Sequence, residues 1–134
     1  MSTTPQQQVA PPAPFTIERL QGNSPSTVIF RLTGPFTARK MYGHLTPDDL
    51  QNLLAFHSTP GEQLPQLNIL DLSAVPYMDS LGLGMIVTHY VSSTNKGVKT
   101  IAAGLTPRVL ELFQMTKVDS IIPIAATVDE ADIN

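Results

Sequence analysis

Two apolar segments, Leu67 to Ser73 and Val98 to Gly104, limit the folds open to this chain more than any other feature of its sequence. The first is apolar nearly throughout, as a strand covered on both faces is, and the second repeats that character more weakly. Between them hydrophobic residues recur at helical spacing until Gly97 supplies a C-terminal stop; they are Leu83, Ile86, Val87, Tyr90 and Val91. A strand–helix–strand unit of this length requires a right-handed parallel crossover.

The residues before this unit predict two more strands and another helix. An imperfect alternation from Phe15 to Gly22 and the β-branched and aromatic run from Thr27 to Thr33 predict an antiparallel pair of strands. Thr46 can cap a helix, and Pro47 suits its first position because an N–H there would have no partner. The two acids that follow place negative charge at the positive end of the helix dipole. The helix that begins there has a buried stripe at Leu50, Leu53, Leu54 and His57, and we interpret that histidine as a core residue rather than a ligand.

The C-terminal residues complete an α/β pattern. Thr106 and Pro107 repeat the cap-and-proline start, which predicts a helix that ends near Lys117 with a stripe at Val109, Leu110 and Phe113. The sequence IIPIAA then predicts a short edge strand, because Pro123 has no N–H to donate to a neighbouring strand. The last residues, TVDEADIN, have the composition to begin a further helix, which we expect them to be too few to complete. The order β-β-α-β-α-β-α-β predicts a single α/β domain whose mixed sheet has about four to five strands, with about three to four helices.

Composition and charge narrow the functional classes. The 134-residue chain has the length of one domain, and its net charge of −3 leaves no excess of Lys or Arg to neutralise a phosphate backbone, so we expect no nucleic-acid partner. The absence of Cys excludes disulfides, thiolate zinc sites and a cysteine nucleophile. No apolar run approaches the roughly 20 residues that span a bilayer, and we expect a cytoplasmic protein without direct membrane insertion. Residues 1–14 are polar and proline-rich, which predicts a disordered leader before a domain at residues 15–134.

The segment DSLGLG, Asp79 to Gly84, stands where the predicted second helix begins, just beyond the carboxyl end of a strand. Loops at that end of an open α/β sheet usually carry the functional sites. Asp79 or Ser80 can cap the helix, a structural role worth about 1 kcal/mol. Gly82 and Gly84 each cost a helix roughly 0.8 to 1 kcal/mol relative to Ala, so they either admit another backbone closely or leave the first-turn N–H groups open to an anion or a partner. Both alternatives place Ser80 on an exposed ledge.

Two longer segments resemble a known family. The run ILDLSAVPYMDSLGLGMIV, residues 69–87, is similar to the core motif of STAS domains, and specifically of bacterial anti-sigma factor antagonists. The run VKTIAAGLTPRVLELFQMTKVDSIIPI, residues 98–124, resembles the later strand, helix and closing edge strand of that family. The resemblance covers roughly residues 15–128 and implies a STAS-like fold for the predicted α/β domain.

The resemblance implies a role in signalling. In anti-sigma factor antagonists the serine after the motif's aspartate is phosphorylated by a partner that is both a serine kinase and an anti-sigma factor, and a serine phosphatase reverses the reaction; by position that serine is Ser80. A phosphate there adds about −1.5 to −2 charge where the helix dipole favours an anion, so we expect it to spare the fold and disrupt the partner interface. A weak homodimer is compatible with the resemblance, and no cofactor or metal is implied. The implied partner-binding residues are Thr37, Met78, Asp79, Ser80, Leu81, Gly82, Leu83 and Gly84.

The chain departs from the family pattern at three places. The residues Gly34-Pro35-Phe36-Thr37 stand where the family usually has an acidic turn resembling G-E-L-D, so Thr37 replaces a carboxylate that neighbours the serine. The link from Arg39 to Leu45 is longer than usual, and Leu81 occupies a position where Ser or Thr is common. A second interpretation of the same resemblance is a constitutive STAS scaffold, either in a signalling assembly or in a lipid or anion transporter complex, with Ser80 serving only as a cap.

An enzymatic role finds little support in the sequence. A hydrolase triad needs a histidine and an acid beside a nucleophile such as Ser80, and the chain contains both types. The candidates are His44, His57, His89, Asp71 and Asp79. His89 lies about half a turn around the same helix from Ser80 and roughly 10 Å or more along it, which excludes a hydrogen bond between them. The chain has no G-x-S-x-G, G-x-x-x-x-G-K-[ST] or H-E-x-x-H motif. We therefore predict a protein without catalytic activity.

Methionines flank the predicted ledge at Met78 and Met85. Most methionines in such a chain fill the core or the loops. Adaptable apolar side chains also suit a partner surface, so both residues are candidates for exposure beside Ser80.

Overall fold

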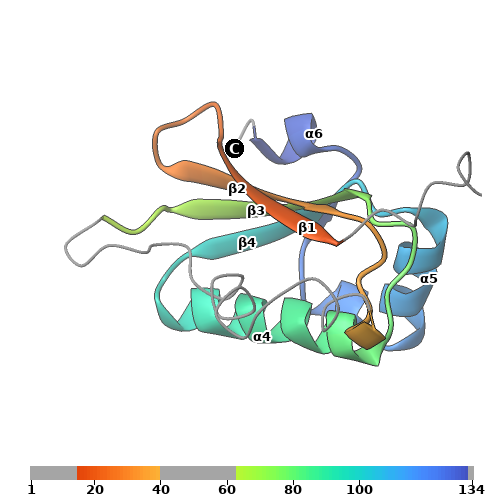
Figure 1. Ribbon diagram of the computed structural model, residues 1–134. Helices are drawn as coiled ribbons and strands as arrows, with labels where there is room; N and C mark the ends of the chain where they lie inside the picture. Colours follow the sequence, from red (N-terminus) through yellow and green to blue (C-terminus); the bar gives the residue numbers. More distant parts are fainter. Residues whose placement is uncertain (1–14, 40–62, 133–134) are drawn as a thin grey trace, which may run out of the picture.

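The computed structural model describes residues 15–39 and 63–132 of the chain. The predicted leader and the helix predicted to begin at Thr46 lie outside the described residues, as do His44, His57 and most of the link from Arg39 to Leu45. Figure 1 traces the described elements from the N-terminal hairpin to the last helix.

The described residues form a five-stranded mixed sheet with three α-helices. The strands are β1 (Thr16–Gln21), β2 (Thr27–Thr33), β3 (Leu67–Ala74), β4 (Lys99–Ala103) and β5 (Ile124–Ala125). The helices are α4 (Ser80–Asn95), α5 (Pro107–Met115) and α6 (Val128–Asp132), with a short 3-10 helix, η1 (Val118–Ser120), before β5. The strand order follows the chain, β1-β2-β3-β4-β5; β1 is antiparallel to β2 and the other neighbouring pairs are parallel. The predicted α/β class, mixed sheet and edge position of the last strand are confirmed.

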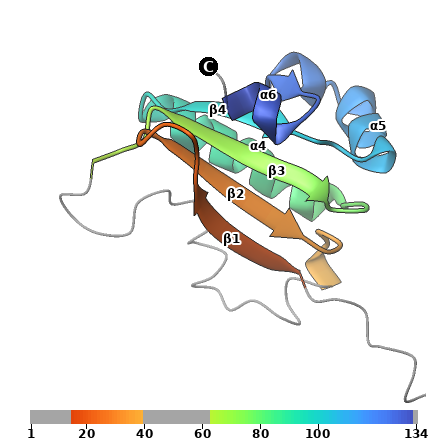
Figure 2. The same cartoon turned by 90° about the horizontal axis from the view of Figure 1, so that it is seen from above.

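The sheet is a layer between helices (Figures 1 and 2). α4 lies under one face and α6 on the other, while α5 lies at the end toward which the parallel strands point. β3 and β4 are parallel, with Leu67 opposite Lys99 and Asp71 opposite Ala103, as the predicted crossover requires. Because β2, β3 and β4 are parallel, their carboxyl ends meet at one edge, and the connections that leave that edge form the part of the surface where such folds carry sites.

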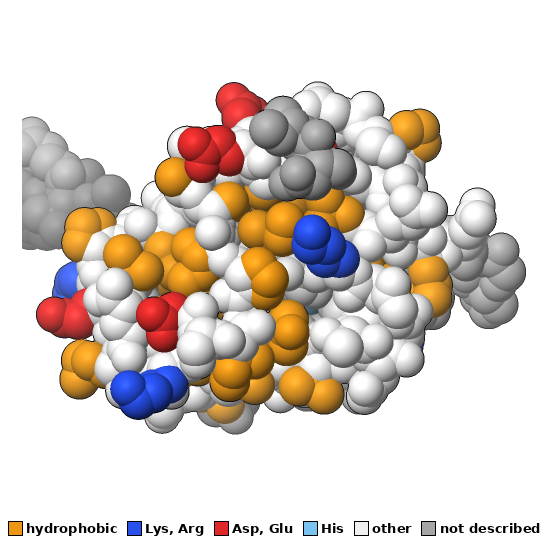
Figure 3. Space-filling model, turned by 180° about the vertical axis from the view of Figure 1, so that it is seen from behind, with side chains coloured by type: hydrophobic (Ala, Val, Ile, Leu, Met, Phe, Trp, Pro, Cys, Tyr) orange, Lys and Arg blue, Asp and Glu red, His pale blue; other side chains and the backbone are white. Residues whose placement is uncertain are grey.

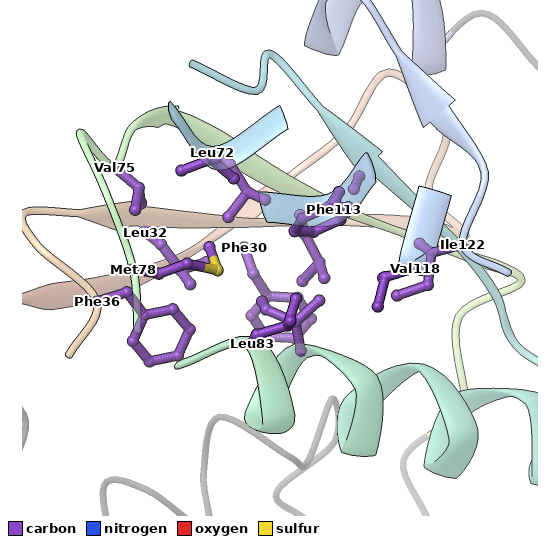
Figure 4. Close-up of a cluster of buried hydrophobic side chains, with 14 of the residues drawn as sticks. Phe30, Leu32, Phe36, Leu72, Val75, Met78, Leu83, Phe113, Val118 and Ile122 are labelled. Atoms are coloured by element: carbon purple, nitrogen blue, oxygen red, sulfur yellow. The ribbon is translucent and has the colours of Figure 1, made fainter. Parts of the chain in front are cut away.

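The main hydrophobic core lies between the sheet and the helices α4 and α5. Phe15 and Phe36 are buried within it and stack with ring centroids 4.4 Å apart and an interplanar angle of 9°. Since Phe36 belongs to the loop after β2, this contact anchors that loop. Figure 4 shows the side chains that converge there, which include Phe30, Leu32, Leu72, Val75, Met78, Leu83, Phe113, Val118 and Ile122.

The buried face of α4 includes only some of the apolar residues that recur at helical spacing in the sequence. Of the residues at helical spacing, Leu83 and Ile86 are buried, whereas Val91 is 48% exposed. Val87 and Tyr90 are half-buried. Apolar and small residues surround this helix on most sides, so spacing alone does not determine which face is buried. The face that packs on the sheet consists of Gly82, Leu83, Ile86, His89 and Ser93.

A buried polar cluster joins α4 to the middle of the sheet. Asn68 of β3 and His89 of α4 are both fully buried, and His89 Nε2 lies 2.8 Å from Asn68 Oδ1. An amide oxygen only accepts, so His89 Nε2 is the donor. The Asn68 amide nitrogen donates to Thr100 Oγ1 at 2.9 Å and to Ser93 Oγ at 3.3 Å. The cluster therefore fixes the position of α4 over β3 and β4.

The opposite face of the sheet has a smaller core covered by α6. Asp132 of α6 accepts hydrogen bonds from the Asn23 N–H, which ties the C-terminal helix to the β1–β2 turn. Figure 3 views the molecule from the β5 side, where apolar side chains are interspersed with few charged ones. Within residues 15–39 and 63–132, no helix combines the length and the apolar character needed to cross a membrane. The side chains of the smaller core are Ile29, Leu67, Ile69, Ile101, Ala103 and Ala131.

Candidate functional site

Ser80 is the first residue of α4, and the connection that leads to it leaves the edge where β2, β3 and β4 end. The residue is exposed, and its hydroxyl makes no hydrogen bond within the described part of the chain. A primary hydroxyl in this position is open to solvent and to another protein.

Asp79 caps α4 and also joins the helix to the loop after β2. Its Oδ1 accepts hydrogen bonds from the N–H groups of Leu81 and Gly82 at 3.1 and 3.0 Å. Its Oδ2 accepts from the Ala38 N–H at 2.9 Å, and its own N–H donates to the Phe36 carbonyl at 3.2 Å. A single carboxylate thus holds the start of the helix against the loop, and the serine that follows it takes its position from these contacts.

The pKa of Asp79 lies below its ordinary value of 3.8. Partial burial by itself raises this pKa, but the hydrogen bonds from the N–H groups of Ala38, Gly82 and Leu81 favour the ionised form and outweigh burial. The side chain is therefore a carboxylate at neutral pH. Because it occupies the N–H groups of Leu81 and Gly82, those groups are not open to a second anion, and that explanation for the glycines is not supported.

The two glycines of the motif have different surroundings. A Cβ at Gly82 would lie 2.2 Å from the Phe36 carbonyl oxygen and 3.2 Å from Met78 Cβ. Phe36 and Met78 are also paired by an isolated parallel bridge, which brings the loop across the helix start. Among the described residues, a Cβ at Gly84 would meet no atom within 4 Å. Close approach of another backbone explains Gly82, whereas packing does not require glycine at position 84.

The structure divides the predicted partner-binding residues into accessible and buried ones. Met78 and Leu83 are each only 8% exposed and point into the main core (Figure 4), and Gly82 is buried. Met78 and Leu83 fill the core beneath the loop, so their side chains are not accessible to a partner. The prediction that they contact the partner was therefore wrong. Met85 is half-buried. We call the remaining residues, which are exposed or half-buried, the Ser80 ledge: Thr37, Asp79, Ser80, Leu81 and Gly84.

Two residues that the sequence did not single out border the Ser80 ledge. Tyr77 is 37% exposed, and the guanidinium carbon of Arg108 lies 4.8 Å from the centroid of its ring. Thr106 Oγ1 donates to the Val75 carbonyl at 2.8 Å instead of capping α5, so the start of that helix is held against the loop that leads to Ser80. The contact between Tyr77 and Arg108 depends on the approach of the loop before α4 to the start of α5, and no local pattern in the sequence indicates that approach.

The described residues do not assemble a hydrolase triad. His89 is buried against the sheet, while Ser80 is exposed on the surface. Asp71 instead accepts a hydrogen bond from Ser73 Oγ at 2.6 Å and pairs with Arg31 at 3.3 Å. Within the part of the chain that the structure describes, no three His, Asp or Glu side chains are grouped so that they could hold a metal ion.

Comparison with known proteins decides the family. A model of the STAS domain family matches residues 19–131. The chain belongs to the STAS domain family. Over 55 residues it is 38% identical to the anti-sigma-B factor antagonist of Listeria monocytogenes, a match that covers 41% of this chain and 48% of that protein. The chain thus spans about half the length of the curated relatives that it matches.

Solved STAS structures share the fold. A sulfate transporter family protein from Wolinella succinogenes aligns with a TM-score of 0.65 and 20% identity, covering 81% of this chain and 83% of that one. The anti-sigma factor antagonist SpoIIAA in its unphosphorylated form aligns with a TM-score of 0.56 and 21% identity, covering 89% and 94%. At these identities the likeness shows the fold alone, and it includes both an antagonist and a transporter-family protein.

Proposed function

We propose that this STAS protein is an anti-sigma factor antagonist that binds an anti-sigma factor through the Ser80 ledge and is switched by phosphorylation of Ser80. The observation that carries the proposal is the exposed Ser80 hydroxyl, which has no hydrogen-bond partner among residues 15–39 and 63–132 and lies at a helix start capped by the Asp79 carboxylate. The name of the Listeria relative supports an antagonist role. The partner is an anti-sigma factor with serine kinase activity, a serine phosphatase reverses the modification, and the cycle operates in the cytoplasm without catalysis by this chain.

The surroundings of Ser80 favour an effect on the partner rather than on the fold. A phosphate adds about −1.5 to −2 charge at a helix N-terminus, where the dipole tolerates negative charge. The N–H groups of Leu81 and Gly82 remain bound to the Asp79 carboxylate, so the phosphate increases the local negative charge without replacing the cap. A partner packed on the ledge then meets repulsion and the cost of desolvating the phosphate.

Variants at Ser80 test the switch. We expect Ser80→Ala to capture the anti-sigma factor from lysate of the native organism as wild type does, and Ser80→Asp to lose it while keeping a wild-type circular dichroism spectrum. Ser120→Asp, an exposed serine on η1, is the matched control and should bind normally. Capture of the same partner by Ser80→Asp at wild-type level would rule out the switch.

A constitutive scaffold is the second candidate, and the likeness to the Wolinella transporter-family protein is the observation that favours it. In that role, in a signalling assembly or a lipid or anion transporter complex, Ser80 carries no phosphate. Intact-mass spectrometry of the protein from its native cells separates the two candidates. A mass increment of about 80 Da on Ser80, the mass that one phosphate adds, supports the switch, and its absence under all growth and stress conditions supports the scaffold.

A further inference from the structure

We propose that Tyr77 and Arg108 form an anchor for the partner beside the Ser80 ledge, and that the partner contributes a carboxylate from an acidic segment to Arg108. This inference rests on the proposed function, because it specifies the chemistry of the partner at the same surface. It adds two residues that are not among the partner-binding residues implied by the family resemblance, and it fixes the sign of the charge that the partner presents.

The geometry of Arg108 suits a carboxylate. Its guanidinium carbon lies over the Tyr77 ring, and the side chain makes no ion pair or hydrogen bond with any described residue. By contrast, Arg31 is engaged by Asp71 on the sheet. The contact with the ring leaves N–H donors of the guanidinium available, and its planar fork binds a carboxylate through two parallel hydrogen bonds. The ring also restricts the side chain before binding, which lowers the entropy lost when a partner arrives.

The anchor and the Ser80 ledge belong to one platform. The Tyr77 carbonyl accepts a hydrogen bond from the Phe36 N–H at 3.0 Å, in the loop that Asp79 also holds. On the other side, Thr106 ties the start of α5 to the loop before α4. Hydrogen bonds therefore join three chain segments at this edge of the sheet. An exposed tyrosine and an arginine are also the residue types that most often dominate the affinity of protein interfaces.

Charge decides which partner segment fits. The chain as a whole has a net charge of −3, yet Arg108, in the first turn of α5, places a cation over Tyr77 in the loop that leads to Ser80. The Asp79 carboxylate is already bound by three backbone N–H groups. An acidic partner segment is attracted to Arg108. The same segment is repelled once phosphoserine adds about −1.5 to −2 charge at position 80, which provides a physical reason for release.

The probe for the test is a purified partner protein. It is the protein that both wild type and Ser80→Ala capture and that Ser80→Asp fails to capture. By titration calorimetry at low salt, we expect Arg108→Gln to weaken its binding by about tenfold and Arg108→Glu by more, with the difference shrinking as salt is raised. Tyr77→Phe keeps the ring and should bind as wild type, whereas Tyr77→Leu should weaken binding severalfold. Lys99→Gln, an exposed cation at the opposite end of β4, is the matched control and should have no effect.

The outcomes separate the inference from the proposed function. If no captured protein depends on the state of Ser80, both are overturned. If such a protein is found but Arg108→Gln binds it within twofold of Lys99→Gln, the function stands and the anchor is wrong. Recovery of Arg108→Glu binding by a Glu→Lys or Asp→Lys change in the partner would establish the contact directly, and failure of every acidic residue of the partner to do so would exclude a carboxylate.

Discussion

At the scale of single residues, Gly82 and Gly84 belong to one motif but have different surroundings: one is in close contact with another backbone and the other lies on the surface. Both weaken the start of α4 by the same intrinsic amount, about 0.8 to 1 kcal/mol relative to Ala. Only Gly82 lies against another backbone, that of Phe36, while Gly84 faces open space one turn beyond Ser80. No contact within the described ranges accounts for glycine at position 84, which leaves the surface without a side chain beside the proposed switch.

Substitution by alanine should therefore have opposite effects at the two positions. Gly82→Ala forces a Cβ against the Phe36 carbonyl and should lower the free energy of unfolding by about 1 to 3 kcal/mol, as overpacking does. Gly84→Ala should raise it by about 0.8 to 1 kcal/mol. Urea denaturation of both variants beside wild type measures the two shifts. A stabilised Gly82→Ala, or a Gly84→Ala that is less stable than wild type, would contradict this account of the motif.

At the scale of secondary structure elements, sequence patterns predicted the features that depend on residues close in the sequence, such as the bounds of a strand. The β-branched run predicted β2 at Thr27–Thr33, the bounds observed, and Pro123 correctly indicated an edge strand. The spacing predicted the helix α4 but not which of its faces is buried, because its apolar residues point in most directions and packing on the sheet selects among them. Asn68 pairing with His89 was not foreseen, since no periodicity links a strand residue to a helix residue 21 positions later. A polar residue inside an apolar strand was the only signal available.

The Asn68 cluster should contribute substantially to the attachment of α4 to the sheet. Asn68→Leu leaves the buried His89 Nε2–H and the Lys99 carbonyl without the Asn68 partner, and we expect a loss of about 2 to 4 kcal/mol of unfolding free energy. Asn95→Leu, at the exposed C-terminal end of α4, should change it by less than about 0.5 kcal/mol. Chemical denaturation compares the two variants, and equal midpoints for both would show that the cluster is energetically neutral.

At the scale of the whole molecule, the candidate site is also a junction that holds the fold together. Asp79 and Ala38 are 41 residues apart in the sequence, and their hydrogen bond joins the loop after β2 to the helix after β3. The Phe36 ring, which stacks on Phe15 in the core, fixes the same loop. Because the platform for a partner is built from these long-range contacts, the geometry of the switch depends on the folded state of the entire domain.

Acid should weaken the whole fold partly through Asp79. The pKa of this carboxyl is lower in the folded protein than in the unfolded chain, so the stabilisation it provides is complete above the unfolded value, near 3.8, and is lost as pH falls through the folded value. Asp79→Asn should lower the free energy of unfolding by about 1 kcal/mol between pH 5 and 7, because its amide cannot accept from the Ala38 N–H as well as from the helix start. Below about pH 4 the gap between the variant and wild type should narrow, since protonation removes the same acceptor from wild type. Urea denaturation across this range measures the gap, with Asp119→Asn, an exposed carboxylate on η1, as the control; a gap that stays constant down to pH 2 would show that the Asp79 carboxylate does not stabilise the fold through its charge.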